Sequence, residues 1–240
     1  MSNPLPSLLQ KYRISFHPVV PFDPAADKLC PFDFTDKNST LAPDEIADTE
    51  RFADYINRAL KANHCRYGIG GYNEHRTLYA RSRHFDGGKD ADEGTEMPDG
   101  TTEPRRLHLG IDIWGPAGTK VMSPLDGLVH SFAFNKNDSD YGATLILTYQ
   151  LDAVSFHVLY GHLSLNSLKN LREGATIRKG QVIGEFGMRF ENGNWPPHLH
   201  FQLIRDMQGW KGDYPGVCKL SERERWLENS PDPAELLQMS

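Results

Sequence analysis

The stretch Asn194-Trp-Pro-Pro-His-Leu-His-Phe-Gln-Leu-Ile204 places two histidines, His198 and His200, around one leucine inside an apolar run. The apolar residues that follow favour a β-strand, in which side chains two residues apart project from the same face, roughly 6–7 Å apart. The sequence therefore predicts that two imidazoles enter one pocket together. An isolated pair of this kind is equally consistent with ordinary core packing.

A second segment, Arg106-Leu-His-Leu-Gly-Ile-Asp-Ile113, adds His108 and Asp112. Two imidazoles and one carboxylate form the ligand set of a catalytic zinc that keeps one position open for water. In a straight strand His108 and Asp112 would lie roughly 13 Å apart, too far to share one ion. Because the segment is a poor helix and a fair strand, we expect a bend at Gly110 or a loop that begins at His108.

A third segment, Leu159-Tyr-Gly-His-Leu-Ser164, places His162 at the end of an apolar run. With the two segments above, it resembles the lysostaphin-type zinc metallopeptidase family, the peptidoglycan endopeptidases with H-x-x-x-D and H-x-H motifs. Short segments also follow in the family's order, at residues 115–119, 124–129, 180–184 and 197–201. Because several short motifs in one order rarely arise by chance, the combined signal is strong.

The resemblance implies that His108, Asp112 and His200 bind Zn²⁺, whose open position holds a water. It implies that His162 and His198 orient this water, take its proton or stabilise the oxyanion. The H-E-x-x-H helix of other zinc proteases is missing, so the histidine pair supplies the acid-base role. The implied activity is a metalloendopeptidase acting on peptidoglycan stems or cross-bridges, with a peptide or peptidoglycan as its substrate.

The fold implied by the resemblance is an antiparallel β-sandwich or barrel of the lysostaphin-like type. The residues agree, since short strand-like runs alternate with turns between residues 119 and 190, and their connections are too short for helical crossovers. An amphipathic helix is predicted at about residues 43–62 and a short terminal helix at residues 221–228. Residues 1–40 are read as an extended arm.

Three parts of the chain are expected. Residues 1–65 would form an N-terminal arm and helix packed on the domain, residues 66–205 the zinc peptidase domain, and residues 206–240 a C-terminal extension. The formal net charge of −6 offers no basic field for nucleic acid or a membrane surface. No signal peptide or membrane anchor is recognised near residue 1, which predicts the cell envelope if the chain is exported and the cytoplasm otherwise.

The three cysteines are odd in number and widely spaced, so free thiols are expected, although a Cys30–Cys65 or Cys65–Cys218 bridge stays open. Asn73 is read as a turn residue, with metal blocking as the alternative. Residues 86–105 are predicted to form a mobile loop beside the metal site. Tyr160 and Trp195 are candidate groove walls or packing residues.

Other classes of function remain open. The chain could be a non-catalytic binding or regulatory module of the same fold, or an intracellular hydrolase with a substrate outside the cell wall. A phosphocarrier with paired histidines on a β-sandwich is a further alternative, against which Asp112 and the H-x-H spacing favour a metal. Stoichiometric zinc would separate an enzyme from a carrier.

Overall fold

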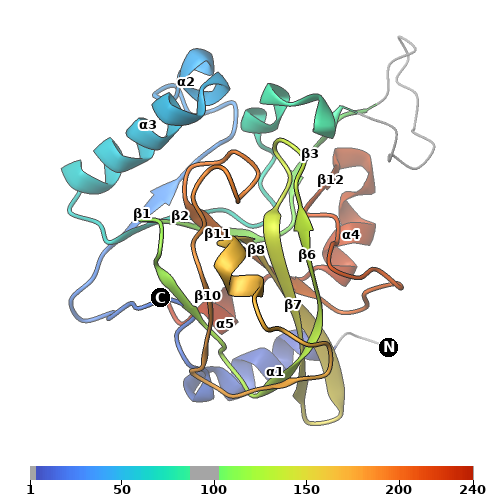
Figure 1. Cartoon of the computed structure of the whole chain (residues 1–240). Coiled ribbons are helices and arrows are strands. Elements are labelled where there is room, and N and C mark those ends of the chain that lie inside the picture. Colours follow the sequence, from blue (N-terminus) through green and yellow to red (C-terminus); the bar gives the residue numbers. More distant parts are fainter. Residues whose placement is uncertain (1–3, 87–102, 240) are drawn as a thin grey trace.

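The computed structural model describes residues 4–86 and 103–239, and its centre is a sheet of eight strands in the order β1-β2-β4-β11-β8-β7-β6-β9 (Figure 1). In that order the strands are Leu29–Phe32, Tyr67–Gly70, Ile111–Trp114, His198–Ile204, Val154–Leu163, Gly142–Leu151, Gly127–Asn135 and Thr176–Ile177. Every neighbouring pair is antiparallel except β1 and β2. The predicted mainly antiparallel β fold is confirmed.

Two further pairs of strands flank this sheet, and both are antiparallel. Strand β5 (Lys120–Met122) pairs with β10 (Val182–Glu185), while β3 (Arg105–His108) pairs with β12 (Val217–Lys219). The segment that carries His108 and Asp112 is therefore divided between two sheets. Strand β3 belongs to the small sheet with β12, and β4 belongs to the large sheet.

Helices cover the ends of the large sheet (Figure 1). The α-helices are α1 (Leu5–Tyr12), α2 (Pro43–Ala47), α3 (Thr49–Ala62), α4 (Arg223–Asn229) and α5 (Ala234–Leu237). Short 3₁₀ helices lie at η1 (Arg13–Ser15), η2 (Thr77–Arg81), η3 (Arg83–Phe85), η4 (Leu165–Leu168) and η5 (Leu220–Glu222). The helix predicted at residues 43–62 is divided at Asp48, whose carboxylate caps α3 by accepting hydrogen bonds from the backbone N–H groups of Glu50 and Arg51.

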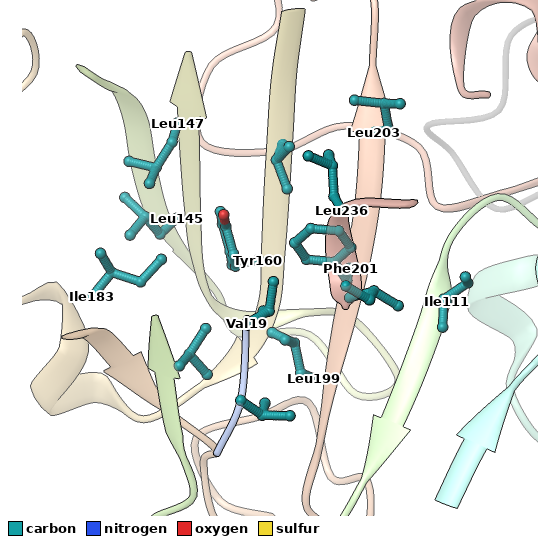
Figure 2. Packing of buried hydrophobic residues seen from close by; sticks show 14 of the residues in the cluster. Val19, Ile111, Leu145, Leu147, Tyr160, Ile183, Leu199, Phe201, Leu203 and Leu236 are labelled. Atoms are coloured by element: carbon teal, nitrogen blue, oxygen red, sulfur yellow. The ribbon is translucent and has the colours of Figure 1, made fainter. Parts of the chain in front are cut away.

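The prediction of an extended arm for residues 1–40 was wrong. Residues Leu5 and Leu9 of α1 lie one helical turn apart and are fully buried in the main core, because side chains at this spacing share one helix face. Strand β1 also belongs to the large sheet. Figure 2 shows the core that these elements join, with Val19 and Leu236 packed among side chains of the central strands.

The expectation of free thiols was wrong for two cysteines. A disulfide joins Cys30 of β1 to Cys65, which lies three residues after the end of α3, while Cys218 is a free, buried thiol. The bridge is possible because β1 pairs with β2, which starts two residues after Cys65, so the fold brings the two cysteines to one sheet edge. In the described part of the chain, no helix is long and apolar enough to cross a membrane.

Candidate metal centre

The bend predicted near Gly110 is present and brings His108 to Asp112. Strand β3 ends at His108 and β4 starts at Ile111, and the chain turns between them. Gly110 permits this turn against the neighbouring strand, since a Cβ atom there would lie 2.7 Å from Cε1 of His200. The side chains of His108 and Asp112 therefore meet, with Nε2 of the histidine 3.3 Å from Oδ1 of the aspartate.

Strand β11 supplies the third member of the group. His200 lies directly opposite Asp112 in the β4–β11 pairing. Its Nδ1 atom is 3.1 Å from Asp112 Oδ1 and 2.9 Å from His108 Nε2. Within the described residues, His108, Asp112 and His200 are the single group of three or more potential metal ligands, with ligand atoms within 4.8 Å of one another. All three are buried.

The remaining nitrogen of each imidazole is held by an oxygen acceptor. His108 Nδ1 lies 3.0 Å from the carbonyl oxygen of Gly71, and His200 Nε2 lies 2.9 Å from Oε1 of Gln202. Since these oxygens only accept hydrogen bonds, both nitrogens carry the proton. The lone pairs of His108 Nε2 and His200 Nδ1 therefore face each other and Asp112 Oδ1.

This arrangement fits a cation. Burial, and next the nearby guanidinium of Arg76, lower the pKa of His108 to about 4, so its ring is neutral at pH 7. The lone pair of the neutral His108 ring then converges with a carboxylate oxygen of Asp112 beside Nδ1 of His200. Neutral imidazole and carboxylate are zinc ligands, and metal-bound histidines characteristically donate their second N–H to an oxygen. The residues present are thus suited to a zinc ion.

The residues that support this group were not singled out from the sequence. Gln202 is fully buried, and its amide nitrogen donates to Pro215 O at 3.1 Å and to Ser230 Oγ at 3.0 Å. Its position two residues after His200 on the same strand face was the available signal. Arg76 donates to Asp112 Oδ2 from Nη1. Nothing in the sequence around Arg76 identified Asp112 as its partner.

The second histidine pair lies in the same pocket. His162 and His198 stack at a ring-centroid distance of 4.0 Å, and His198 also stacks on Trp114 at 3.9 Å. Nδ1 of His162 donates to Asn192 O at 2.8 Å, and Nδ1 of His198 donates to Pro196 O at 2.8 Å. Burial lowers the pKa of His198 to about 4 and that of His162 well below its usual value. Each ring is therefore neutral, with Nε2 free to accept a proton.

A cavity of about 500 Å³ connects these groups. Its lining includes Asp112, His162, His198, His200 and Trp195. Tyr160, the other candidate groove wall, is a core residue whose hydroxyl bonds to that of Tyr149 at 2.8 Å. His130 and His157 pack against each other elsewhere on the sheet, at a centroid distance of 5.0 Å.

Asn73 has the left-handed backbone conformation of a turn residue, with φ of 57°. Its side-chain oxygen accepts a hydrogen bond from Nε of Arg223 at 2.9 Å. The reading as a turn residue is therefore supported over metal blocking. Most of the predicted loop at 86–105 lies outside the described residues, which resume at 103.

Comparison with known proteins agrees with this geometry. Residues 106–212 match the model of peptidase family M23. A DD-carboxypeptidase/endopeptidase of Neisseria meningitidis is 33% identical over 97 residues, which are 40% of this chain and 20% of that protein. The L-Ala–D-Glu endopeptidase of Bacillus subtilis is 30% identical over 107 residues, 42% of this chain and 31% of that protein.

Among solved structures, the chain is similar to the catalytic domain of lysostaphin from Staphylococcus simulans, with 25% identity and a TM-score of 0.38 over 55% of this chain and 80% of that one. This chain spans about a fifth of the length of the Neisseria relative and about a third of the Bacillus relative. The matched region contains both histidine motifs and the buried group described above. Residues 106–212, which carry this buried group, are therefore similar to peptidase family M23.

Proposed function

We propose that this protein is a zinc-dependent metalloendopeptidase, with Zn²⁺ bound by His108, Asp112 and His200. The observation that carries the proposal is the convergence of two imidazole lone pairs and one carboxylate oxygen in a buried group open to a cavity. Bound zinc would lower the pKa of a water and polarise the scissile carbonyl.

The other two histidines supply proton transfer. His162 and His198 are neutral, and the carbonyl oxygens that hold their Nδ1 atoms leave both Nε2 atoms as bases. One ring accepts the proton of the attacking water and returns it to the leaving amine, while the other donates or accepts a hydrogen bond to keep the reacting groups aligned. Because the rings stack at 4.0 Å, a proton on one ring opposes protonation of its neighbour, so the pair carries no more than one extra proton at a time.

The proposed substrates are peptide bonds in peptidoglycan stems or cross-bridges. Support comes from the relatives, which are described as a DD-carboxypeptidase/endopeptidase and an L-Ala–D-Glu endopeptidase. A phosphocarrier is disfavoured because His200 is only 3% exposed and is hydrogen bonded through one nitrogen to Gln202. A non-catalytic module would not require the two extra histidines to retain free Nε2 atoms in the cavity.

The test is incubation of zinc-loaded protein with purified sacculi and a panel of cross-linked muropeptides, followed by mass spectrometry. The proposal expects new amino termini at one type of peptide bond. A variant with His162→Ala serves as the control, because it should keep the metal and lose turnover. Absence of cleavage by fully zinc-loaded wild-type protein across the panel would favour the binding module.

A further inference from the structure

The two oxygens of the Asp112 carboxylate have different partners. Oδ1 faces the two imidazole nitrogens, at 3.3 Å from His108 and 3.1 Å from His200. Oδ2 instead accepts a hydrogen bond from Nη1 of Arg76 in a buried ion pair. His108, Asp112 and His200 are called the metal group below. One oxygen of Asp112 thus faces the two histidines of this group, and the other is hydrogen bonded to Arg76.

The guanidinium of Arg76 is fixed from several sides. The side chain is 1% exposed, and its Nε donates to Oε2 of Glu74 at 2.6 Å. Weaker contacts join Nη1 to the hydroxyl of Tyr79 at 3.3 Å and Nη2 to the carbonyl of Gly71 at 3.4 Å. A planar guanidinium held by this many partners has little freedom to follow the carboxylate if the carboxylate rotates.

The same short segment also holds a second ligand. The carbonyl of Gly71 that contacts Arg76 accepts the Nδ1 proton of His108, and the carbonyl of Glu74 accepts the backbone N–H of His108 at 2.9 Å. Residues 71–76 therefore contact two members of the metal group, yet they precede the region that matches the peptidase family. Residues outside the matched region therefore help to hold His108 and Asp112 in place.

We propose that Arg76 is a positioning residue, which occupies Oδ2 of Asp112 so that the aspartate offers a single oxygen to the metal. The inference rests on the proposed function, since it concerns how the ion is held. Without the guanidinium, the carboxylate could turn and offer both oxygens, which would add a ligand at the position needed by water or substrate. Glu74 and the Gly71 carbonyl act by orienting the arginine.

The decisive variant is Arg76→Lys. Lysine keeps the positive charge at residue 76, so the electrostatic effect of this residue on a bound cation changes little. It lacks, however, the planar set of N–H donors of arginine. We expect zinc affinity, measured by chelator competition, to fall about 10–100-fold, the usual effect of losing a partner of a metal ligand. In Co²⁺-substituted protein, visible absorption should weaken as the coordination number rises above four.

The matched control is Arg81→Lys. Arg81 lies at the end of the same 3₁₀ helix that follows Arg76, donates to Thr49 Oγ1 at 2.7 Å and contacts the ring of Trp195 at 4.7 Å. These contacts do not involve Asp112, so zinc affinity and the cobalt spectrum should stay at the wild-type values. A purely structural role of buried arginines would instead lower the melting temperature of both variants without changing the cobalt spectrum.

A second variant tests the inference even if Arg76→Lys does not fold. Glu74→Gln keeps Arg76 but replaces the charged anchor of the guanidinium with a neutral amide, and it should shift the cobalt spectrum in the same direction by a smaller amount. A folded Arg76→Lys protein with wild-type affinity and spectrum overturns the inference. So does a Glu74→Gln protein with an unchanged spectrum if Arg76→Lys does not fold. Wild-type protein that binds no zinc contradicts the proposed function instead.

Discussion

At the scale of single residues, the hydrogen-bond partner of each imidazole decides what that imidazole can do. His200 turns Nδ1 towards Asp112 because Gln202 holds Nε2, whereas His108 turns Nε2 towards the same oxygen because Gly71 holds Nδ1. His162 and His198 use Nδ1 for carbonyl groups and keep Nε2. Under the proposed function, these hydrogen bonds divide chemically identical side chains into metal ligands and proton carriers.

The first prediction separates these two roles. His200→Ala and Asp112→Ala should lose the metal and some thermal stability together, because a protein ligand is removed from an ion that joins separate strands. His162→Ala should keep its zinc and nearly its melting temperature, while turnover falls by roughly 10²–10⁴. Zinc content, melting temperature and turnover are measured on the variants in parallel. An empty site in His162→Ala together with a filled site in His200→Ala would reverse the assignment.

The second prediction concerns Gln202, which fixes the tautomer of His200. Replacement by leucine keeps a similar size but removes the oxygen that accepts the Nε2 proton. Zinc affinity should fall about 10–100-fold, as is usual for loss of a partner of a metal ligand. Gln150→Leu is the control, because Gln150 is exposed and its side-chain amide donates to the carbonyl oxygen of Asp152 on the surface, away from the buried histidines. Equal zinc affinity of both variants would exclude a role for Gln202 in the metal group.

At the scale of elements, the decisive feature is the bend that separates β3 from β4. The strands belong to different sheets, and the turn at Gly110 lets residues four positions apart in a strand-forming segment meet at 3.3 Å. The sequence allowed this to be predicted, because a metal shared by His108 and Asp112 is incompatible with a straight strand. The order of the strands and their register could not be predicted from the same motifs.

The third prediction tests the bend. Gly110→Ala would place a Cβ atom 2.7 Å from His200 Cε1 and 2.8 Å from the carbonyl oxygen of Phe201, so zinc affinity and stability should both fall. Gly174→Ala is the control, because its φ of 78° strains an alanine by roughly 1–2 kcal/mol while the added atom meets open space. The control should lose stability and keep its zinc affinity. Normal zinc binding by Gly110→Ala would show that the bend tolerates a side chain.

The elements that were missed have a common physical reason. Helix α1 is short, and its leucines are recognised as core residues only once the core that buries them is known. The disulfide depends on the pairing of β1 with β2, a contact between residues far apart in the chain. Likewise, Arg76 became informative only when the fold placed it against Asp112. Motifs that carry chemistry were visible in the sequence, while their supports depend on tertiary contacts.

At the scale of the whole molecule, the family-matched region does not hold its metal group alone. Gln202 is held by Pro215 and Ser230, which follow that region, and Asp112 is held by Arg76, which precedes it. Tyr72 also donates from its hydroxyl to Ser230 O at 2.7 Å, which links the preceding and following segments. Both segments are therefore expected to affect metal binding.

The fourth prediction concerns the stability of the metal-free protein as pH falls. Burial lowers the pKa values of His108, His157 and His198 to about 4, and lowers that of His162 in the same direction. Between pH 6.5, the ordinary histidine value, and about pH 4 the unfolded chain binds protons that the folded chain does not. The free energy of unfolding should therefore be largest above pH 6.5 and fall through this window.

One carboxyl group opposes this trend. Burial raises the pKa of Asp213 to about 6, so its contribution to stability is present at low pH and is lost as pH rises through 6. Because burial lowers the pKa of five histidines, His130 included, against this one carboxyl group, the net effect should still be a loss of stability on acidification. Urea unfolding of metal-free protein at pH 7 and pH 5 measures it. Equal or greater stability at pH 5 would contradict the buried, neutral state of the histidines.

The most direct measurement of the central claim is X-ray absorption at the zinc edge, combined with elemental analysis, on protein reconstituted with zinc. We predict about one zinc ion per chain, with two imidazole nitrogens and carboxylate or water oxygen at about 2.0–2.2 Å. In Asp112→Ala the ordered signal should be lost. Sulfur ligation at about 2.3 Å, which the buried thiol of Cys218 could supply, or the absence of stoichiometric zinc would contradict the assignment of His108, Asp112 and His200.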